Sequence, residues 1–327
     1  MKLASLKTTG RDGSLIIVNH TLTHYLSAAK IAPTLQWALE NWTQSEEPLQ
    51  QLYKQLNDDP SQGQILDQQK LSSPLPRAYQ WLDGSAYLSH VERVRKARGA
   101  TMPESFLSDP LMYQGSSDYF PGPKDPIEAS NEDDGIDFEA EVAVITDDVP
   151  LGTGEQNANG HIKLIMLVND VSLRNLIPAE LAKGFGFIHG KPPTAFSPLA
   201  VTPNELSTAW HSDKLHLPLL STYNDKLVGK PNAGVDMQFS FAQLIAHAAK
   251  TRPLKAGTII GSGTVSNQDL ASGYSCLAEK RMLEIIESGQ ASTPFMQFGD
   301  RIRIEMNDES GLSIFGSIDQ VVQKCMI

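Results

Sequence analysis

The stretch DFEAEVAV, residues 137–144, alternates apolar and acidic side chains with a period of two. Such alternation predicts a β-strand, because successive side chains of a strand point to opposite faces of the sheet. Phe138 and the alternate apolar residues after it would lie on one face, with Glu139 and Glu141 together on the other. Neighbouring carboxylates repel each other unless a cation lies between them. The stretch therefore predicts either a cation site or, as the alternative, the solvated outer face of an edge strand.

Further acidic residues follow or precede this stretch in positions that suit a cation. Asp170 follows the continuous apolar run 164–168, which is typical of a strand buried on both faces. A carboxylate there costs free energy unless it is paired or binds a metal, although an Asp can also begin a turn. Arg174, four residues later, could pair with Asp170 or bind a substrate carboxylate. Asp83, within 81–84, is by itself typical of a turn. An all-oxygen ligand set suits Mg²⁺, Mn²⁺ or Ca²⁺ better than zinc.

The composition is that of an ordinary globular protein, with 327 residues, 40% hydrophobic and 20% charged. The net charge of −11 gives no general attraction to nucleic acid or anionic lipid, although a local cluster of Arg and Lys could still bind a small anion. No run reaches about 18 apolar residues, and the N-terminus has no signal-peptide core, so neither membrane insertion nor secretion is expected. Cys276 and Cys325 have no metal-ligand spacing and fit a reduced, cytoplasmic protein.

The beginning of the chain differs in pattern from the rest. Residues 2–18 predict a strand pair, and the leucine spacing between 33 and 56 predicts one or two helices. Residues 57–75 are rich in Asp, Gln, Ser and Pro, which is typical of a surface linker. Beyond them, many short apolar runs alternate with Gly, Pro, Asn and Asp. We expect a small α+β N-terminal domain, residues 1–75, and a mainly β domain with some α, residues 76–327, whose sheet is barrel-like or rolled.

Five segments, in the same order, resemble the motifs of the fumarylacetoacetate hydrolase family. They are the paired-glutamate strand 137–144, the Asp-x-Ser-x-Arg turn 169–174, the Gly-Lys pair 190–191, the Gly-Thr loop 263–266 and the Gly-Asp strand 298–305. The resemblance covers about residues 80–327. Each motif alone has low specificity, whereas five in order form a strong signal. The resemblance implies that the larger domain is the family's catalytic domain.

Upstream features resemble the longer, two-domain branch of that family. Asp83 precedes His90 by seven residues, the offset between a metal-binding Asp and a catalytic His in that branch. The segment 111–115 resembles the piece that carries its substrate-contacting tyrosine, here Tyr113. The resemblance implies a divalent cation, Mg²⁺ or Ca²⁺ with Mn²⁺ as a further option. Its implied ligands are Asp83, Glu139, Glu141 and Asp170.

The resemblance also implies a general base. His90 would remove a proton from water, and Glu279, fifteen residues after Thr264, would orient its imidazole. That spacing is one residue longer than the family's. His189, next to the Gly-Lys pair, is a second candidate base, which we expect to lie in a loop near the site.

Cationic and polar residues of the same motifs would hold the substrate. Arg174 and Lys191 would stabilise the oxygens of a leaving enolate, and Tyr113 and Thr264 would contact substrate. Ile177 stands where the family has a glutamine, so one polar contact is missing or is supplied elsewhere. The stretch after His90 offers several candidates for a substrate-binding arginine, and we assign this role to Arg98. These candidates are Arg93, Arg95, Lys96 and Arg98.

The function implied by the resemblance is hydrolysis of a carbon–carbon bond in a β-diketone acid, most directly of fumarylacetoacetate to fumarate and acetoacetate in tyrosine and other aromatic catabolism. The same scaffold also supports acylpyruvate hydrolysis, oxaloacetate decarboxylation and keto-acid isomerisation or hydration. A catalytically silent, metal-stabilised binding protein is the alternative from a different class. The expected partner is a small anionic keto acid, with no nucleic acid and no membrane, and the resemblance implies a homodimer.

Overall fold

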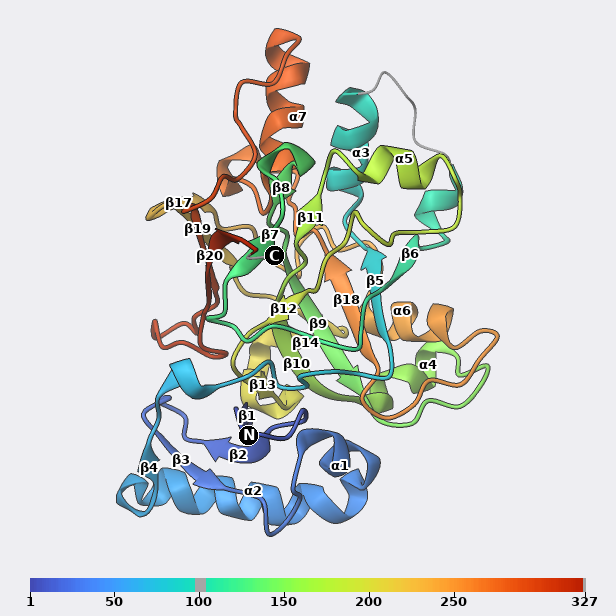
Figure 1. Ribbon diagram of the computed structural model, residues 1–327. Coiled ribbons are helices and arrows are strands. Elements are labelled where there is room, and N and C mark those ends of the chain that lie inside the picture. The colour runs from blue at the N-terminus through green and yellow to red at the C-terminus, as the bar shows by residue number, and fades with distance from the viewer. Residues whose placement is uncertain (98–103, 326–327) are drawn as a thin grey trace.

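The structure is a computed structural model that describes residues 1–97 and 104–325. Its N-terminal segment is an antiparallel meander covered by two helices (Figure 1). The strands pair in chain order, as β1 (Lys2–Leu6), β2 (Ser14–Val18), β3 (His24–Ser27) and β4 (Gln64–Ile65). The helices are α1 (Leu35–Glu40) and α2 (Trp42–Asp58). The strand pair and the helices predicted for this segment are therefore confirmed.

Capping and leucine spacing account for the two helices. The Thr34 side chain accepts a hydrogen bond from the N–H of Trp37 and so provides the N-cap of α1. Leu39 of α1 and Leu49 and Leu56 of α2 are buried in the same hydrophobic cluster as Leu15 of β2. The apolar stripe of the helices thus packs on one face of the meander.

The sheet of the N-terminal segment continues into the rest of the chain. In β1, Lys2 pairs with Val201 and Leu3 pairs with Ala200, so β1 joins β13 (Ala200–Val201). The two parts therefore share one sheet, because the first strand of the chain pairs with a strand of the larger part. The expected linker, 57–75, also contributes the edge strand β4 and the short helices η1 (Pro60–Gln62) and η2 (Gln68–Lys70). The boundary near residue 75 stays a prediction.

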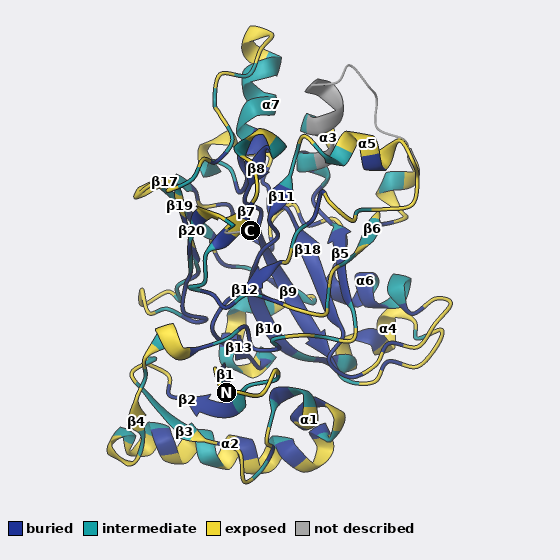
Figure 2. Cartoon of the chain, viewed as in Figure 1, coloured by how far each residue is buried: buried dark blue, intermediate teal, exposed yellow. Residues whose placement is uncertain are grey.

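The central strands of this sheet are buried on both faces (Figure 2). Beyond β13 the sheet runs through β10 (Ile162–Asn169), β9 (Ala140–Thr146), β18 (Ile259–Gly263), β5 (Trp81–Ser85) and β6 (Met112–Gly115), with β12 (Ala195–Phe196) also paired to β10. In β9, Val142 and Val144 join one hydrophobic cluster, and Ala143 and Ile145 join another on the opposite face. β18 and β5 are parallel, while β9 is antiparallel to β10 and β18. The strands β10, β18 and β5 therefore all end at the edge of the sheet where β9 begins.

A second sheet lies beside the first. Its order is β17 (Lys226–Gly229), β16 (Leu220–Tyr223), β19 (Arg301–Glu305), β20 (Ile318–Lys324) and β7 (Ile127–Ala129). Two small pairs are β8 (Ile136–Asp137) with β11 (Ser172–Leu173) and β14 (Trp210–His211) with β15 (Lys214–Leu215). The large sheets and the small N-terminal unit bear out the predicted fold class.

Helices connect and cover the sheets. The longer ones are α3 (Leu88–Ala97), α6 (Phe241–Ala248) and α7 (Leu277–Ser288). The shorter ones are α4 (Glu155–Ala158), α5 (Ile177–Leu181), η3 (Glu104–Leu107), η4 (Glu132–Asp134), η5 (Asn159–His161), η6 (Pro203–Ala209) and η7 (Leu270–Ser272). Within the described ranges, none of these helices has both the length and the apolar character needed to cross a membrane.

Candidate active site

Carboxylates from neighbouring strands converge at the end of the main sheet where β9 begins. One oxygen each of Asp83 on β5, Glu141 on β9 and Asp170 just after β10 lies within 4.8 Å of the others. The register explains the meeting, because Glu141 pairs with Val168, two residues before Asp170. Gly263 leaves room, since a β-carbon there would collide with the Glu141 carboxylate. Segments far apart in sequence thus bring three of the four predicted metal ligands together.

The chemistry of this cluster fits a divalent cation. All three side chains are buried, and among the described residues nothing hydrogen-bonds to Asp83 Oδ1 or to either carboxylate oxygen of Glu141. Burial, followed by the charge of Asp170, raises the pKa of Asp83 to about 7. Burial and the charge of Asp83 also raise the pKa of Glu141 well above its usual range. A buried carboxylate without a partner is costly, and a cation bound among these oxygens would remove that cost.

Glu139 lies beside the cluster and contacts cationic groups. It occupies the break between β8 and β9, so it does not share a strand face with Glu141. Its carboxylate accepts hydrogen bonds from Lys191 Nζ (2.5 Å), Arg174 Nη2 (2.7 Å) and Thr264 Oγ1 (3.0 Å). Burial would raise the pKa of Glu139, but the charges of Arg174 and Lys191 outweigh it and lower that pKa. The edge-strand alternative is wrong, because both glutamates are buried. A ligand role for Glu139 stays a prediction.

Lys191 links Glu139 to the carboxylate cluster. Its Nζ lies 2.5 Å from an oxygen of Glu139 and 2.5 Å from Asp170 Oδ2. Tyr113 also donates its hydroxyl hydrogen bond to Asp170 Oδ2, and Lys191 Nζ lies 5.0 Å from the centre of the Tyr113 ring. Thr194, which sequence analysis missed, donates to Asp170 Oδ1 at 2.7 Å. Thr194 lies only three residues after Lys191, and no pattern in the sequence distinguishes this buried threonine from the other threonines of the chain.

Arg174 binds two carboxylates, but not the one expected from its spacing. Its Nε donates to Asp137 at 2.9 Å and its Nη2 to Glu139, whereas the sequence suggested Asp170 or a substrate carboxylate as its partner. Asp137 also accepts the N–H groups of Leu277 (2.7 Å) and Ala278 (2.9 Å) at the start of α7. Arg174 and the helix that carries the candidate Glu279 are therefore positioned by one buried carboxylate.

The predicted base and its orienting carboxylate meet between α3 and α7, which lie side by side (Figure 1). His90 Nδ1 lies 3.4 Å from Glu279 Oε2. Burial would raise the pKa of Glu279, but the hydrogen bond and charge of His90 and the charge of Arg93 outweigh it and lower that pKa. An ionised Glu279 favours the imidazole tautomer with hydrogen on Nδ1. Nε2 is then the nitrogen that can take a proton.

Arg93 has a different role from the one considered for it. It donates to Glu279 Oε1, to Ser266 Oγ (2.9 Å) and to the Asn267 carbonyl (2.6 Å). The guanidinium thus holds Glu279 beside His90 and is not available as a substrate-binding arginine. Its spacing of three from His90 on a helix was the signal that could have shown this shared face. Arg98 lies outside the described residues, and so do the side chains of Arg95 and Lys96.

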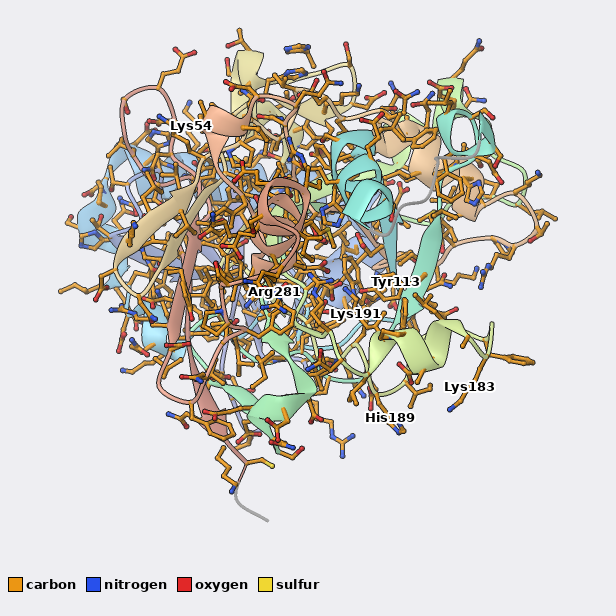
Figure 3. The ribbon with its side chains drawn as sticks, turned by 90° about the horizontal axis from the view of Figure 1, so that it is seen from above. Lys54, Tyr113, Lys183, His189, Lys191 and Arg281 are labelled. Carbon is orange, nitrogen blue, oxygen red and sulfur yellow. The ribbon has the colours of Figure 1, made fainter. Side chains whose placement is uncertain are left out.

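The Glu180 carboxylate holds the end of the loop that precedes Lys191, and we call this contact the Glu180 clamp. The Glu180 carboxylate accepts three main-chain N–H groups, from Ile188 (2.9 Å), His189 (2.8 Å) and Gly190 (2.8 Å). These bonds, that of His189 first, lower the pKa of Glu180. Figure 3 shows Tyr113 and Lys191 near each other and His189 farther out in this exposed loop. The structure thus brings Lys191, and not His189, to the carboxylates.

We expect Glu180→Ala to lower kcat by about 10–100-fold, because losing the clamp displaces the backbone that positions Lys191. Metal affinity measured by calorimetry should change little. Glu180→Gln keeps one acceptor oxygen, so its kcat should lie between those of the wild-type protein and Glu180→Ala. The exposed Glu287→Ala on α7 is the control. A variant with normal kcat and altered thermal unfolding alone would show that the clamp is only structural.

A cavity of about 970 Å³ runs along the free edge of β6 and reaches the site. Tyr113 and Lys191 line this cavity, and both also contact Asp170 of the carboxylate cluster. The loop 184–188 and the residues that follow α6 form its other walls. The site can therefore admit a small molecule past Tyr113 toward the carboxylates.

Comparisons with known proteins agree with the sequence motifs. The family model described as "Fumarylacetoacetate (FAA) hydrolase C-terminal" matches residues 80–323, and "Fumarylacetoacetase N-terminal domain 2" matches residues 1–77. Oxaloacetate tautomerase YisK of Bacillus subtilis is 24% identical over 76% of this chain and 73% of its own length. The mitochondrial oxaloacetate tautomerase fahd2 of Xenopus laevis is 29% identical over 48% of this chain, and that match spans about half of the Xenopus protein, 47%.

Solved structures share the fold over the whole chain. Fumarylacetoacetate hydrolase from Exiguobacterium antarcticum has a TM-score of 0.67 at 16% identity and covers 99% of this chain and 100% of that one. Maleylpyruvate hydrolase from Sphingobium sp. SYK-6 has a TM-score of 0.66 at 14% identity, with the same coverage. The latter enzyme has also been solved with manganese(II) and pyruvate, and that structure has a TM-score of 0.64 at 15% identity, covering 100% of both chains.

Proposed function

We propose that this chain, which belongs to the fumarylacetoacetate hydrolase family, hydrolyses a carbon–carbon bond next to a carbonyl in a small anionic β-diketone acid. The observation that carries the proposal is the contact of His90 with the buried Glu279, together with the buried carboxylate cluster. The two groups are linked by Glu139, whose pKa is lowered in part by the charge of His90 and whose partner Lys191 also contacts Asp170. A hydrolase needs a base that activates water, and the pair of His90 and Glu279 supports that role. Fumarylacetoacetate is the substrate we propose first, with aromatic catabolism as the context.

A divalent cation held by Asp83, Glu141 and Asp170 would act as a Lewis acid on the substrate carbonyls. Mg²⁺, Ca²⁺ and Mn²⁺ remain the candidate cations, and Mn²⁺ is supported by the structure of maleylpyruvate hydrolase with manganese(II). Glu139 would either be a further ligand or hold Lys191 and Arg174 in place.

The chain's own residues would move protons and stabilise charge. His90 would take a proton from water through Nε2, while the Glu279 carboxylate stabilises the resulting imidazolium. The resulting hydroxide adds to the carbonyl carbon, the bond to the neighbouring carbon breaks, and its electron pair leaves as an enolate. Lys191 and Arg174 offer fixed positive charge to the enolate oxygen. The His90 imidazolium would then return its proton to the enolate carbon, which yields the two acids and restores the neutral base.

Keto–enol tautomerisation of a keto acid is the second candidate function. It is favoured by the two oxaloacetate tautomerases among the relatives. The same base would remove a proton from carbon in place of water, with no bond cleaved. The cytoplasmic location and the homodimer remain proposals that rest on the family resemblance.

Turnover of a substrate panel would decide between these functions. The panel contains fumarylacetoacetate, an acylpyruvate and oxaloacetate, with product acids, enol absorbance and released CO₂ followed separately. We expect release of two acids, dependent on added Mg²⁺ or Mn²⁺ and abolished by chelator. Enol–keto interconversion without acid release would replace the hydrolase proposal with the tautomerase. Metal binding without turnover of any compound would favour the silent binding protein.

A further inference from the structure

We propose that Lys250 and Arg252 form an anion-binding subsite at the rim of the β6 cavity, which selects keto acids that carry a second carboxylate. The subsite deepens the proposed function, because that function places the keto end of the substrate at Tyr113 and Lys191. Nothing in the chemistry of the carboxylate cluster itself requires a second anionic group.

The cavity is lined by groups that could bind each end of such a substrate. Its lining includes Tyr113 and Lys191, which contact the carboxylate cluster, and also the three residues 250–252 beyond the end of α6. The β6 segment 112–116 lies between these walls. In Figure 1, α5 and the loop after it lie on one side of β6 and α6 lies on the other. A molecule whose keto group reaches Lys191 can therefore extend along β6 toward the α6 side.

The two cations at this rim have no protein partner among the described residues. Lys250 and Arg252 are exposed, and neither side chain forms an ion pair or a hydrogen bond with the part of the chain that the structure describes. The cations of the inner site differ, because Lys191 and Arg174 are already bound to buried carboxylates. In the same lining, His247 lies 3.5 Å from Asp109. Among the described residues that line the cavity, Lys250 and Arg252 are thus the cations whose side chains have no partner within the protein.

The surroundings make this charge selective. The chain as a whole carries −11, so most of its surface disfavours an anion. An arginine can bind a carboxylate through two parallel N–H groups, and a neighbouring lysine adds a point charge. A terminal carboxylate would find both here, whereas a terminal methyl group would gain nothing from them.

A purely structural explanation makes a different prediction. Cations just after the last turn of α6 interact favourably with the helix dipole. If that were their only role, removing them would lower the thermal stability and leave ligand binding unchanged. Ligand selectivity therefore separates the two explanations.

Paired substrates test the subsite in the full-length, metal-loaded protein. One acylpyruvate ends in a carboxylate, and the other has the same length and ends in a methyl group. For Lys250→Ala and Arg252→Ala we expect KM to rise about fivefold each for the first substrate, which is the upper end for an ion pair at an exposed site. KM for the second substrate and kcat for both should stay within twofold. The exposed Lys226→Ala on β17 is the matched control.

A binding measurement keeps this test independent of turnover. Calorimetry would compare α,ω-dicarboxylates, from succinate to adipate, with monocarboxylates of equal length. Arg252→Glu should weaken the dicarboxylates selectively. Equal loss for both series, or no loss, would overturn the subsite. If the wild-type protein turned over neither acylpyruvate but lost dicarboxylate binding in Arg252→Glu, the proposed function would fail while the subsite stood.

Discussion

His90→Ala is expected to lower kcat by about 10²–10⁴-fold, the range for losing a general base. The reason is geometric, because His90 is held against Glu279, whose lowered pKa keeps it ionised as the partner of Nδ1. In the described part of the chain, His90 is the histidine that pairs with Glu279, and no histidine joins the group formed by Asp83, Glu141 and Asp170. Steady-state kinetics on the substrate identified by the panel would measure the loss.

Metal affinity distinguishes this loss from general damage to the site. It should remain unchanged in His90→Ala, because the imidazole is not part of the carboxylate cluster that fits the cation. His189→Ala is the matched control, since that side chain lies in the exposed loop, and it should retain near-normal kcat. Near-normal turnover in His90→Ala together with a large loss in His189→Ala would transfer the base role to His189.

The parts of the site that sequence predicted well are those fixed by strand register. Asp170 follows a long apolar run and Glu141 lies in an alternating one, and antiparallel pairing of these runs brings their acidic ends together. Asp83 reaches the same end because β5 is parallel to β18, the strand next to β9. Apolar patterning decides which residues form the strands, so the carboxylates at their ends are predictable.

The parts that could not be predicted depend on breaks and on partners distant in sequence. The alternation from 137 to 144 suggested one strand, but the break at Glu139 directs its carboxylate to Lys191 and Arg174. Arg93 contacts Glu279, 186 residues further along the chain, and the helical spacing from His90 predicts a shared face without identifying this distant partner. The join of β1 to β13 has the same cause, since the alternation of a strand does not specify its neighbour.

Asp83→Asn should weaken divalent-cation binding by at least about 10²-fold, because even outer partners of metal ligands contribute 10–100-fold. The same change should stabilise the metal-free protein, since Asp83 and Glu141 are the two carboxylates of the cluster with buried oxygens that have no partner among the described residues. An unsatisfied buried polar group costs about 1–3 kcal/mol, so the melting temperature in chelator should rise by a few degrees. The variant would be more stable without metal and less able to bind it.

Thermal unfolding with and without metal tests both parts of this prediction. In the wild-type protein, a cation at 100 times its dissociation constant should add about 2.7 kcal/mol to the free energy of unfolding. Asp83→Asn should lose most of that increment, while the exposed Glu309→Gln should keep it. A drop in stability without metal would mean that Asp83 has a partner other than a cation. If Asp83→Asn left the metal-induced gain in stability unchanged, Asp83 would not be a ligand. Glu139 would then be the next carboxylate to test beside Glu141 and Asp170. To bind the metal, Glu139 would have to lose its present contact with Lys191.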